Sequence, residues 1–164
     1  MSQWGRITLW DAAADGNLEV LQKRLQMELA KIDAQDSQGK TAMHEAARWD
    51  HAHIVKHLVE VGATTELADT EGRTALHVAA AFGQLQAITA LIECGAEKEA
   101  QTWDGDTPLH LAAAGGHVDA TRLLLDLGAN AGARNGLKKQ PRDVAANTDT
   151  AELFREKKYI SPTK

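Results

Sequence analysis

Three histidines stand at equal intervals in the sequence, and they are the side chains with the most obvious capacity for chemistry. His44, His77 and His110 follow one another at 33-residue steps. Imidazole nitrogens bind zinc at about 2.0–2.1 Å, so a zinc site is one hypothesis. Packed helices, however, lie roughly 8–10 Å apart. If each histidine belongs to a different packed helix, one metal ion cannot reach all three.

Two other groups could react or bind a metal. His53 and His57 are four residues apart and could chelate a metal from one helix face, but the sequence offers no third ligand. Cys94 occupies a position where the corresponding residues are Val61 and Leu127. An apolar position favours a packing role for the thiol, with a reactive thiol as the alternative. We therefore expect no metal site.

The sequence contains no pattern typical of an enzyme. A hydroxyl or thiol nucleophile needs a positioned base and a third group that orients the base. The regularly placed threonines (Thr41, Thr74 and Thr107) belong to the same repeated pattern as the histidines. The glycines also follow this period and form no phosphate-binding or dinucleotide-binding pattern. The sequence predicts a protein without catalytic activity and without a cofactor.

The elements that would position these residues are short helices. Thr41 stands directly before an Ala-rich apolar run, where its side-chain oxygen can accept a hydrogen bond from a helix-start amide. A second apolar series begins at Ile54 with spacings of one, three and four residues, which indicate a helix with a wide apolar stripe. Gly62 follows at a position suited to a C-terminal cap. Each unit is thus predicted to be a helix–turn–helix pair followed by an exposed turn.

The same unit occurs several times in the chain. The stretch GKTAMHEAARWDHAHIVKHLVEVGA begins at Gly39, and close copies begin at Gly72 and Gly105. One helix pair cannot enclose its own apolar stripe, so each unit must stack on its neighbours. The repetition therefore predicts an all-α repeat solenoid whose core lies between the units.

The repeated motif resembles that of the ankyrin repeat. The pattern G-x-T-x-x-H-x-A-A with a period of 33 residues is clearest in GDTPLHLAAAGGH, which begins at Gly105. The resemblance implies ankyrin-type helix–turn–helix units with β-turn or hairpin loops. It also implies that the motif histidine bonds to loop backbone, and that the turn tips and first helices form a concave binding surface.

The resemblance extends over nearly the whole chain as a single ankyrin repeat domain, residues 1–160. In the first unit Trp10 replaces the motif histidine, and in the last QPRDVAAN from Gln140 replaces the motif. A helix from about Thr150 to Lys158 is expected to close the stack. We predict about five units: a cap at 1–35, repeats at 36–68, 69–101 and 102–134, a degenerate cap at 135–160, and then a frayed tail at 161–164.

Charge and composition limit the possible partners. The formal net charge is -5, and eight basic and four acidic residues from Arg134 onward leave the preceding body at -9. An acidic body is unsuited to nucleic acid as the main partner. No stretch approaches the roughly 18 apolar residues of a membrane span. The single cysteine fits a reducing compartment. We expect a monomer in the cytoplasm, or alternatively in the nucleus, that acts without a membrane.

Large apolar side chains mark a candidate binding surface. Trp49 and Phe82 occupy the same position in consecutive repeats, and the resemblance implies that this position faces the concave groove. Trp103 falls at a turn tip. Exposed aromatic residues on neighbouring repeats indicate an interaction patch. The alternative is that they are partly buried against the loop of the next repeat.

Charged residues adjoin these aromatics and suggest what the partner carries. Arginine is a favoured interface anchor, and acidic neighbours suit a partner with basic residues around an apolar centre. The charged candidates are Arg48, Arg73, Glu45, Glu71, Asp104 and Asp106.

The predicted function is protein binding by an adaptor or scaffold module that uses this concave face. Two alternatives use the same groove: a regulatory or inhibitory subunit of an enzyme, and a structural tile of a large assembly. Fold alone does not choose among them. If the aromatics only pack, the next candidate surface is the basic C-terminal cap around Lys138, Lys139 and Arg142.

Overall fold

A computed structural model describes residues 7–28 and 31–159 of the chain, and within these ranges it is helical and contains no strand. The first helices of the pairs are α1 (Leu9–Ala14), α3 (Ala42–Arg48), α5 (Ala75–Phe82) and α7 (Pro108–Ala114). The second helices are α2 (Leu18–Glu28), α4 (Ala52–Glu60), α6 (Leu85–Glu93) and α8 (Val118–Asp126). The C-terminal elements are the 3₁₀ helix η2 (Pro141–Val144), α9 (Thr148–Leu153) and the 3₁₀ helix η3 (Lys157–Tyr159).

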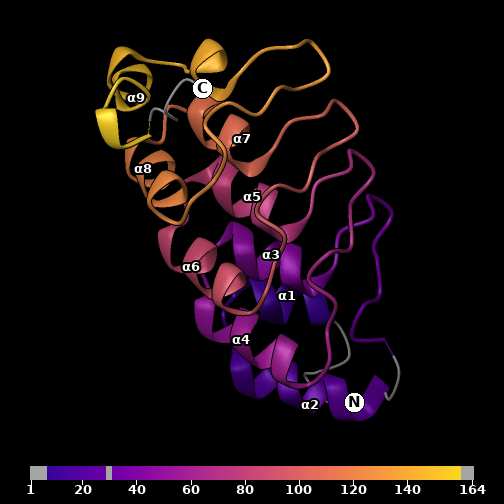
Figure 1. Cartoon of the computed structure of the whole chain (residues 1–164). Coiled ribbons are helices and arrows are strands. Elements are labelled where there is room, and N and C mark those ends of the chain that lie inside the picture. Colours follow the sequence, from indigo (N-terminus) through magenta and orange to yellow (C-terminus); the bar gives the residue numbers. More distant parts are fainter. Residues whose placement is uncertain (1–6, 29–30, 160–164) are drawn as a thin grey trace.

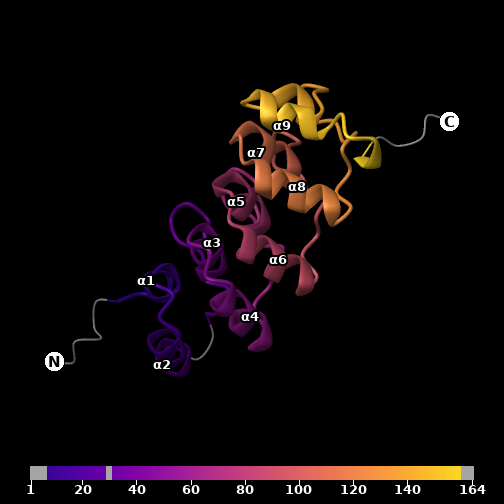
Figure 2. The ribbon, with the colours of Figure 1, turned by 90° about the vertical axis from the view of Figure 1, so that its left-hand side faces the viewer.

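The helices form two parallel rows. Figure 2 shows the row of first helices (α1, α3, α5, α7) beside the row of second helices (α2, α4, α6, α8). Each first helix packs on the next one in its row, and α6 packs on both α4 and α8. Figure 1 shows the connecting turns extending to one side of the stack. The predicted all-α repeat solenoid is therefore confirmed.

The core lies between the repeats. Small alanine side chains let the first helices approach closely, and the branched residues of the second helices fill the space behind them. Each added repeat removes apolar surface from water at roughly 25 cal/mol per Å². The residues with 0% exposure include Ala46, Ala47, Ala79, Ala80, Ala112, Ala113, Ile54, Leu58, Ile88, Leu91 and Leu124.

The motif histidines are buried and link each repeat to the next. The backbone N–H of Thr41 donates to Nδ1 of His44 at 3.1 Å, so Nδ1 is an acceptor and the ring proton resides on Nε2. Nε2 then donates to the carbonyl of Arg73 in the following turn at 2.9 Å. His77 and His110 repeat this arrangement, reaching the carbonyls of Asp106 at 3.0 Å and Lys139 at 2.9 Å. These hydrogen bonds to loop backbone confirm the structural role expected for the histidines.

The first unit keeps this link without a histidine. The indole Nε1 of Trp10 donates to the carbonyl of Lys40 at 2.9 Å. A neutral N–H donor therefore occupies the same place in all four first helices. The helix start is also closed locally, because the N–H of Asp11 donates to the Thr8 hydroxyl at 3.1 Å.

A second set of inter-repeat hydrogen bonds lies at the other end of the first helices. His51 Nε2 bonds to the carbonyl of Ala14 at 2.9 Å, and Gln84 Nε2 donates to that of Arg48 at 2.6 Å. His117 Nε2 bonds to the carbonyl of Ala81 at 2.8 Å. These side chains satisfy carbonyls that a helix end leaves without an intrahelical partner. Each first helix is thus fixed at both ends by the repeat that follows it.

The turns are held by their own first residues and by each other. Asp36 Oδ1 accepts from the backbone N–H of Gln38 at 2.8 Å and of Lys40 at 2.9 Å, an arrangement common for Asp in turns. Between successive turns, the N–H of Thr70 donates to the carbonyl of Gln38 at 3.0 Å, and that of Gly136 to the carbonyl of Asp104 at 2.8 Å. The turns therefore stack in register with the helices.

The C-terminal unit differs from the prediction. The closing helix α9 begins at Thr148, where Asn147 caps it, close to the predicted start at about Thr150. It ends at Leu153, so the predicted end at Lys158 is wrong. A turn and η3 follow instead, and the hydroxyl of Tyr159 at the end of η3 bonds to the carboxylate of Asp126 on α8 at 2.5 Å.

The motif segment of this last unit is also shorter than the earlier ones, forming one 3₁₀ turn in η2 rather than an α-helix. Residues 1–6 of the first cap and the tail 161–164 lie outside the described residues. The unit boundaries given by the sequence remain our proposal.

Asp50 combines an unfavourable backbone with a favourable hydrogen bond. Its φ is 61°, in the left-handed region that Gly16, Gly83 and Gly116 occupy at the same place in their units. Its Oδ1 accepts from the N–H of Ala87 in the first turn of α6 at 2.8 Å. This carboxylate therefore caps a helix of the next repeat.

We predict different effects for two substitutions of Asp50. Asp50→Ala loses the cap and keeps a side chain in the left-handed region, so the free energy of unfolding should fall by about 1–2 kcal/mol. Asp50→Gly loses the cap but relieves the backbone, and its change should stay within about 0.5 kcal/mol. Urea unfolding of both variants measures this. Equal losses would contradict the role assigned to the backbone conformation.

We also predict that stability falls in mild acid. Burial lowers the pKa of His44 and of His77 below the ordinary value of about 6.5. The unfolded chain then binds protons that the folded chain does not, so the full stability is present above about pH 6.5 and is lost as pH falls below it. The loss should reach about 1.4 kcal/mol per pH unit for each histidine. Urea unfolding between about pH 8 and pH 5 measures the slope.

A variant separates these histidines from other titrating groups. His77→Gln removes one of the two titrating rings while leaving an amide that can accept and donate hydrogen bonds. It should be less stable at neutral pH but show a shallower loss below about pH 6.5. The same slope in the variant as in the natural chain would refute the assignment.

Candidate functional site

Arg48, Trp49 and Phe82 form a cluster at the ends of two adjacent first helices. Arg48 and Phe82 are the last residues of α3 and α5, and Trp49 directly follows α3. The guanidinium carbon lies 4.8 Å from the Phe82 ring centroid and 5.6 Å from that of Trp49, within the range of cation–π contacts. Trp49 is 53% exposed and Phe82 48% exposed. The aromatics therefore contact neighbouring side chains and still present ring surface to solvent.

A small cavity of about 80 Å³ opens beside this cluster, between α3 and α5. One side is apolar and the other charged. Its lining residues are Lys40, His44, Glu45, Arg48, Arg73, Val78, Ala81 and Phe82.

Arg73 is held by carboxylates of its own turn. Its Nε lies 2.9 Å from Asp69 Oδ2, and a terminal nitrogen lies 3.0 Å from Glu71 Oε2. Burial would raise the pKa of the Asp69 carboxyl, but hydrogen bonds from Arg73 and Glu71 outweigh it and hold that pKa below its usual value. Arg48 and Lys40, by contrast, form no ion pair within residues 7–28 and 31–159.

Trp103 is positioned by the preceding turn. Its indole Nε1 donates to the carbonyl of Thr70 at 3.2 Å, and its backbone N–H donates to that of Glu71 at 3.3 Å. Gly72 permits this approach, because its φ is 77° and a Cβ there would lie 2.6 Å from the Trp103 nitrogen. Trp103 is nevertheless 74% exposed. It contacts a neighbouring loop, as the packing alternative expects, and also presents a large apolar surface.

The acidic candidates lie with Trp103 at the turn tips. A shallow hollow of about 460 Å³ is lined by Trp103, Asp104, Asp106 and the next turn, including Leu137. Asp104 is exposed, whereas Asp106 Oδ1 accepts from Asn135 Nδ2 at 2.7 Å. Leu137 is 75% exposed and was not among the predicted residues. An apolar residue at a turn tip is the feature of the sequence that could have identified it.

The predicted residues thus fall into two clusters on the face made by the turn tips and the first helices, which we call the concave face. The first contains Glu45, Arg48, Trp49, Arg73 and Phe82, and the second contains Trp103, Asp104 and Asp106. Lys40 and Val78 join the first cluster without having been predicted. Participation of these residues in binding stays a prediction.

Sequence comparison supports the same interpretation of the repeats. A family model for ankyrin repeats, three copies long, matches residues 9–102, 66–135 and 91–160. The chain belongs to the ankyrin repeat family. No curated protein matches the chain at a significant level. Ankyrin repeats are generally protein–protein interaction modules and are typically non-catalytic.

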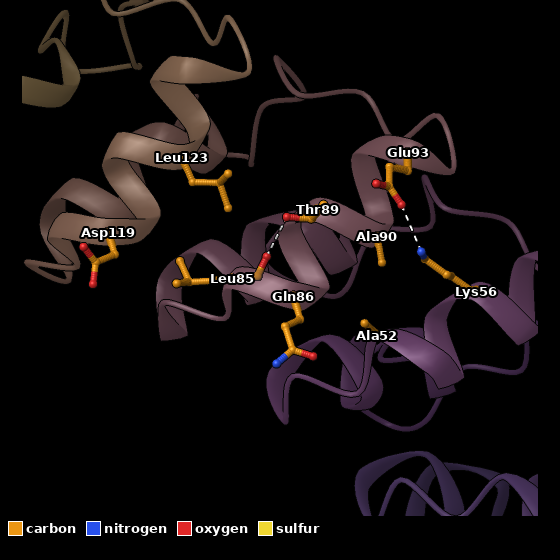
Figure 3. Close-up of a pocket in the computed structure, with 9 residues that line it drawn as sticks. All are labelled: Ala52, Lys56, Leu85, Gln86, Thr89, Ala90, Glu93, Asp119 and Leu123. Atoms are coloured by element: carbon orange, nitrogen blue, oxygen red, sulfur yellow. Dashed lines mark hydrogen bonds and ion pairs between the residues drawn. The ribbon is translucent and has the colours of Figure 1, made fainter.

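The opposite face of this ankyrin stack carries a hollow of about 450 Å³ between α4, α6 and α8 (Figure 3). Lys56 and Glu93 form an ion pair of 3.0 Å across it, and Thr89 Oγ1 donates to the carbonyl of Leu85. These polar groups are satisfied by one another. Leu85, 37% exposed, is the main apolar side chain presented there.

The other reactive groups of the ankyrin chain have structural partners. His53 Nε2 bonds to the carbonyl of Gly16 at 2.9 Å, and His57 Nδ1 lies 3.6 Å from Glu60. Burial raises the pKa of the Cys94 thiol, which favours packing over reactivity. No group of three potential metal ligands occurs among the described residues. In that same part of the chain, no helix is long and apolar enough to cross a membrane.

Proposed function

We propose that this chain is a non-catalytic adaptor or scaffold module that binds one protein partner through its concave face. The observation that supports this most directly is the exposure of Trp49, Phe82 and Trp103 on consecutive repeats. Exposed aromatic surface of this kind is unusual in a monomer and typical of an interface anchor.

The rigidity of the face supports the same proposal. Trp103 is held by two hydrogen bonds to the preceding turn, and the carbonyls of Arg48 and Ala81 are held by the following repeat. A surface already fixed in the free protein loses little conformational entropy when a partner docks. The candidate side chains therefore form a preorganised site.

The charges favour a protein partner with an apolar centre and a basic rim. Asp104 and Asp106 flank Trp103, and acidic side chains around an aromatic anchor attract lysine or arginine of a partner. We propose that the monomer acts in the cytoplasm or nucleus, consistent with its single cysteine. The two alternative functions, a regulatory subunit of an enzyme and a structural tile of a large assembly, would use the same surface but bind a different kind of partner.

We predict that Trp49→Ala, Phe82→Ala and Trp103→Ala each weaken partner binding by about 1–3 kcal/mol, the range of interface anchors. Because all three side chains are about half exposed or more, the fold should remain helical by circular dichroism. The measurement is capture of a partner from cell extract followed by affinities of the purified pair.

The matched control is Leu85→Ala, which removes exposed apolar surface from the opposite face and should leave affinity unchanged. A partner retained equally by a variant that carries all three alanine substitutions would refute the concave site. The next surface to test would then be the one around Lys138, Lys139 and Arg142. Loss of turnover in a captured enzyme would identify a regulatory subunit.

A further inference from the structure

Arg48 is a guanidinium fixed in position but not neutralised. The faces of Phe82 and Trp49 hold it at 4.8 and 5.6 Å, and no carboxylate of the described residues forms an ion pair with it. A guanidinium has five N–H donors, and within residues 7–28 and 31–159 the Arg48 side chain donates none of them in a hydrogen bond. Arg48 therefore presents free donors from a defined position.

The cavity beside Arg48 has an excess of positive charge. Lys40 also faces it and has no ion-pair partner among the described residues. The charge of Arg73 is offset by Asp69 and Glu71, and Glu45 alone supplies an acidic group to the lining. Two unpaired cations thus face one carboxylate.

The opposite wall of the cavity strengthens any charge interaction made there. Val78, Ala81 and Phe82 form an apolar surface, and charges attract more strongly beside such a surface than in open water. The volume of about 80 Å³ corresponds to roughly two or three waters at about 30 Å³ each. A carboxylate with its adjoining methylene is of this size.

We propose that this cavity is an anion subsite of the concave face that binds the side-chain carboxylate of an aspartate or glutamate in a partner protein. Arg48 supplies paired N–H donors to the two carboxylate oxygens, a geometry that guanidinium and carboxylate share. Lys40 adds a second cation, and an aliphatic residue of the partner next to the acid packs on Phe82. This inference rests on the concave face being the binding surface.

The subsite gives a bound segment one preferred orientation on the concave face. Arg48 and Lys40 select an acidic residue at the α3–α5 end, whereas Asp104 and Asp106 select basic residues near Trp103. A segment with the opposite order of charges would place like charges together, which disfavours the reversed orientation. The small cavity and the presence of Glu45 favour a monoanionic carboxylate over a phosphate dianion.

A peptide selection tests the subsite directly. A displayed library of random short peptides is selected on the natural chain, on Arg48→Gln, and on the Trp49→Ala/Phe82→Ala/Trp103→Ala variant. We expect the natural chain to enrich Asp or Glu beside an aliphatic residue. Arg48→Gln should lose the enrichment of acids while keeping that of apolar and basic residues.

Affinities of one selected peptide then measure the pairing. Exchanging its acid for the amide should weaken binding to the natural chain by about 5- to 20-fold, and by less than about 2-fold in Arg48→Gln. Arg48→Lys keeps the charge but not the planar fork, so its affinity should be intermediate. Glu45→Gln should bind the acidic peptide about 2- to 3-fold more tightly, because it removes a like charge. Circular dichroism verifies folding of each variant.

The outcomes separate the subsite from the proposed function. Two outcomes would overturn the subsite and leave the binding face intact. In one, the selected peptides bind the concave face without an acid. In the other, exchanging the acid for the amide weakens binding to Arg48→Gln as much as to the natural chain. A phosphoserine peptide that binds more tightly than its glutamate counterpart would also overturn the carboxylate assignment. Peptides that bind the triple aromatic variant as well as the natural chain, or the absence of any selected peptide, would overturn both.

Discussion

Each repeat depends on one N–H donor that leaves its first helix and reaches a backbone carbonyl in the following turn. Nε2 of His44, His77 and His110 supplies this donor, and the indole of Trp10 supplies it at the N-terminal end. An unpaired buried carbonyl is costly, so this bond sets the position of each turn relative to the helix before it. Stacked turns, and hence the concave face, follow from that repeated constraint.

The second set of inter-repeat bonds places the candidate site. The side chains of Gln84 and His117 hold the carbonyls of Arg48 and Ala81. The ends of α3 and α5 are therefore rigid where Arg48, Trp49 and Phe82 project. The bonds that stabilise the stack also fix the surface proposed to bind a partner, because both lie at the C-terminal ends of the first helices.

The concave face differs in electrostatic character along the stack. At the α3–α5 end Arg48 has aromatic partners and, among the described residues, no ionic one. At the Trp103 end Asp104 is exposed beside an aromatic ring. Arg73 lies close to Arg48 yet is neutralised by its own turn. Two neighbouring arginines thus differ in their capacity to bind an anion. Arg73 lies beside carboxylates of its own turn, and Arg48 does not.

The period of 33 residues and the motif around Gly105 sufficed to predict the helix pairs and their stacking, because these follow from local periodicity. Prediction was poorest at the C-terminal cap, where the last helix ends early and Tyr159 bonds to Asp126 of the preceding unit. The sequence predicted that Trp49, Phe82 and Trp103 share one surface. It could not show that Arg48 lies against the faces of two rings while Arg73 is neutralised, or that Leu137 lines the same hollow as Trp103. Those relations join residues of different repeats, and only the packing of one repeat on the next determines them.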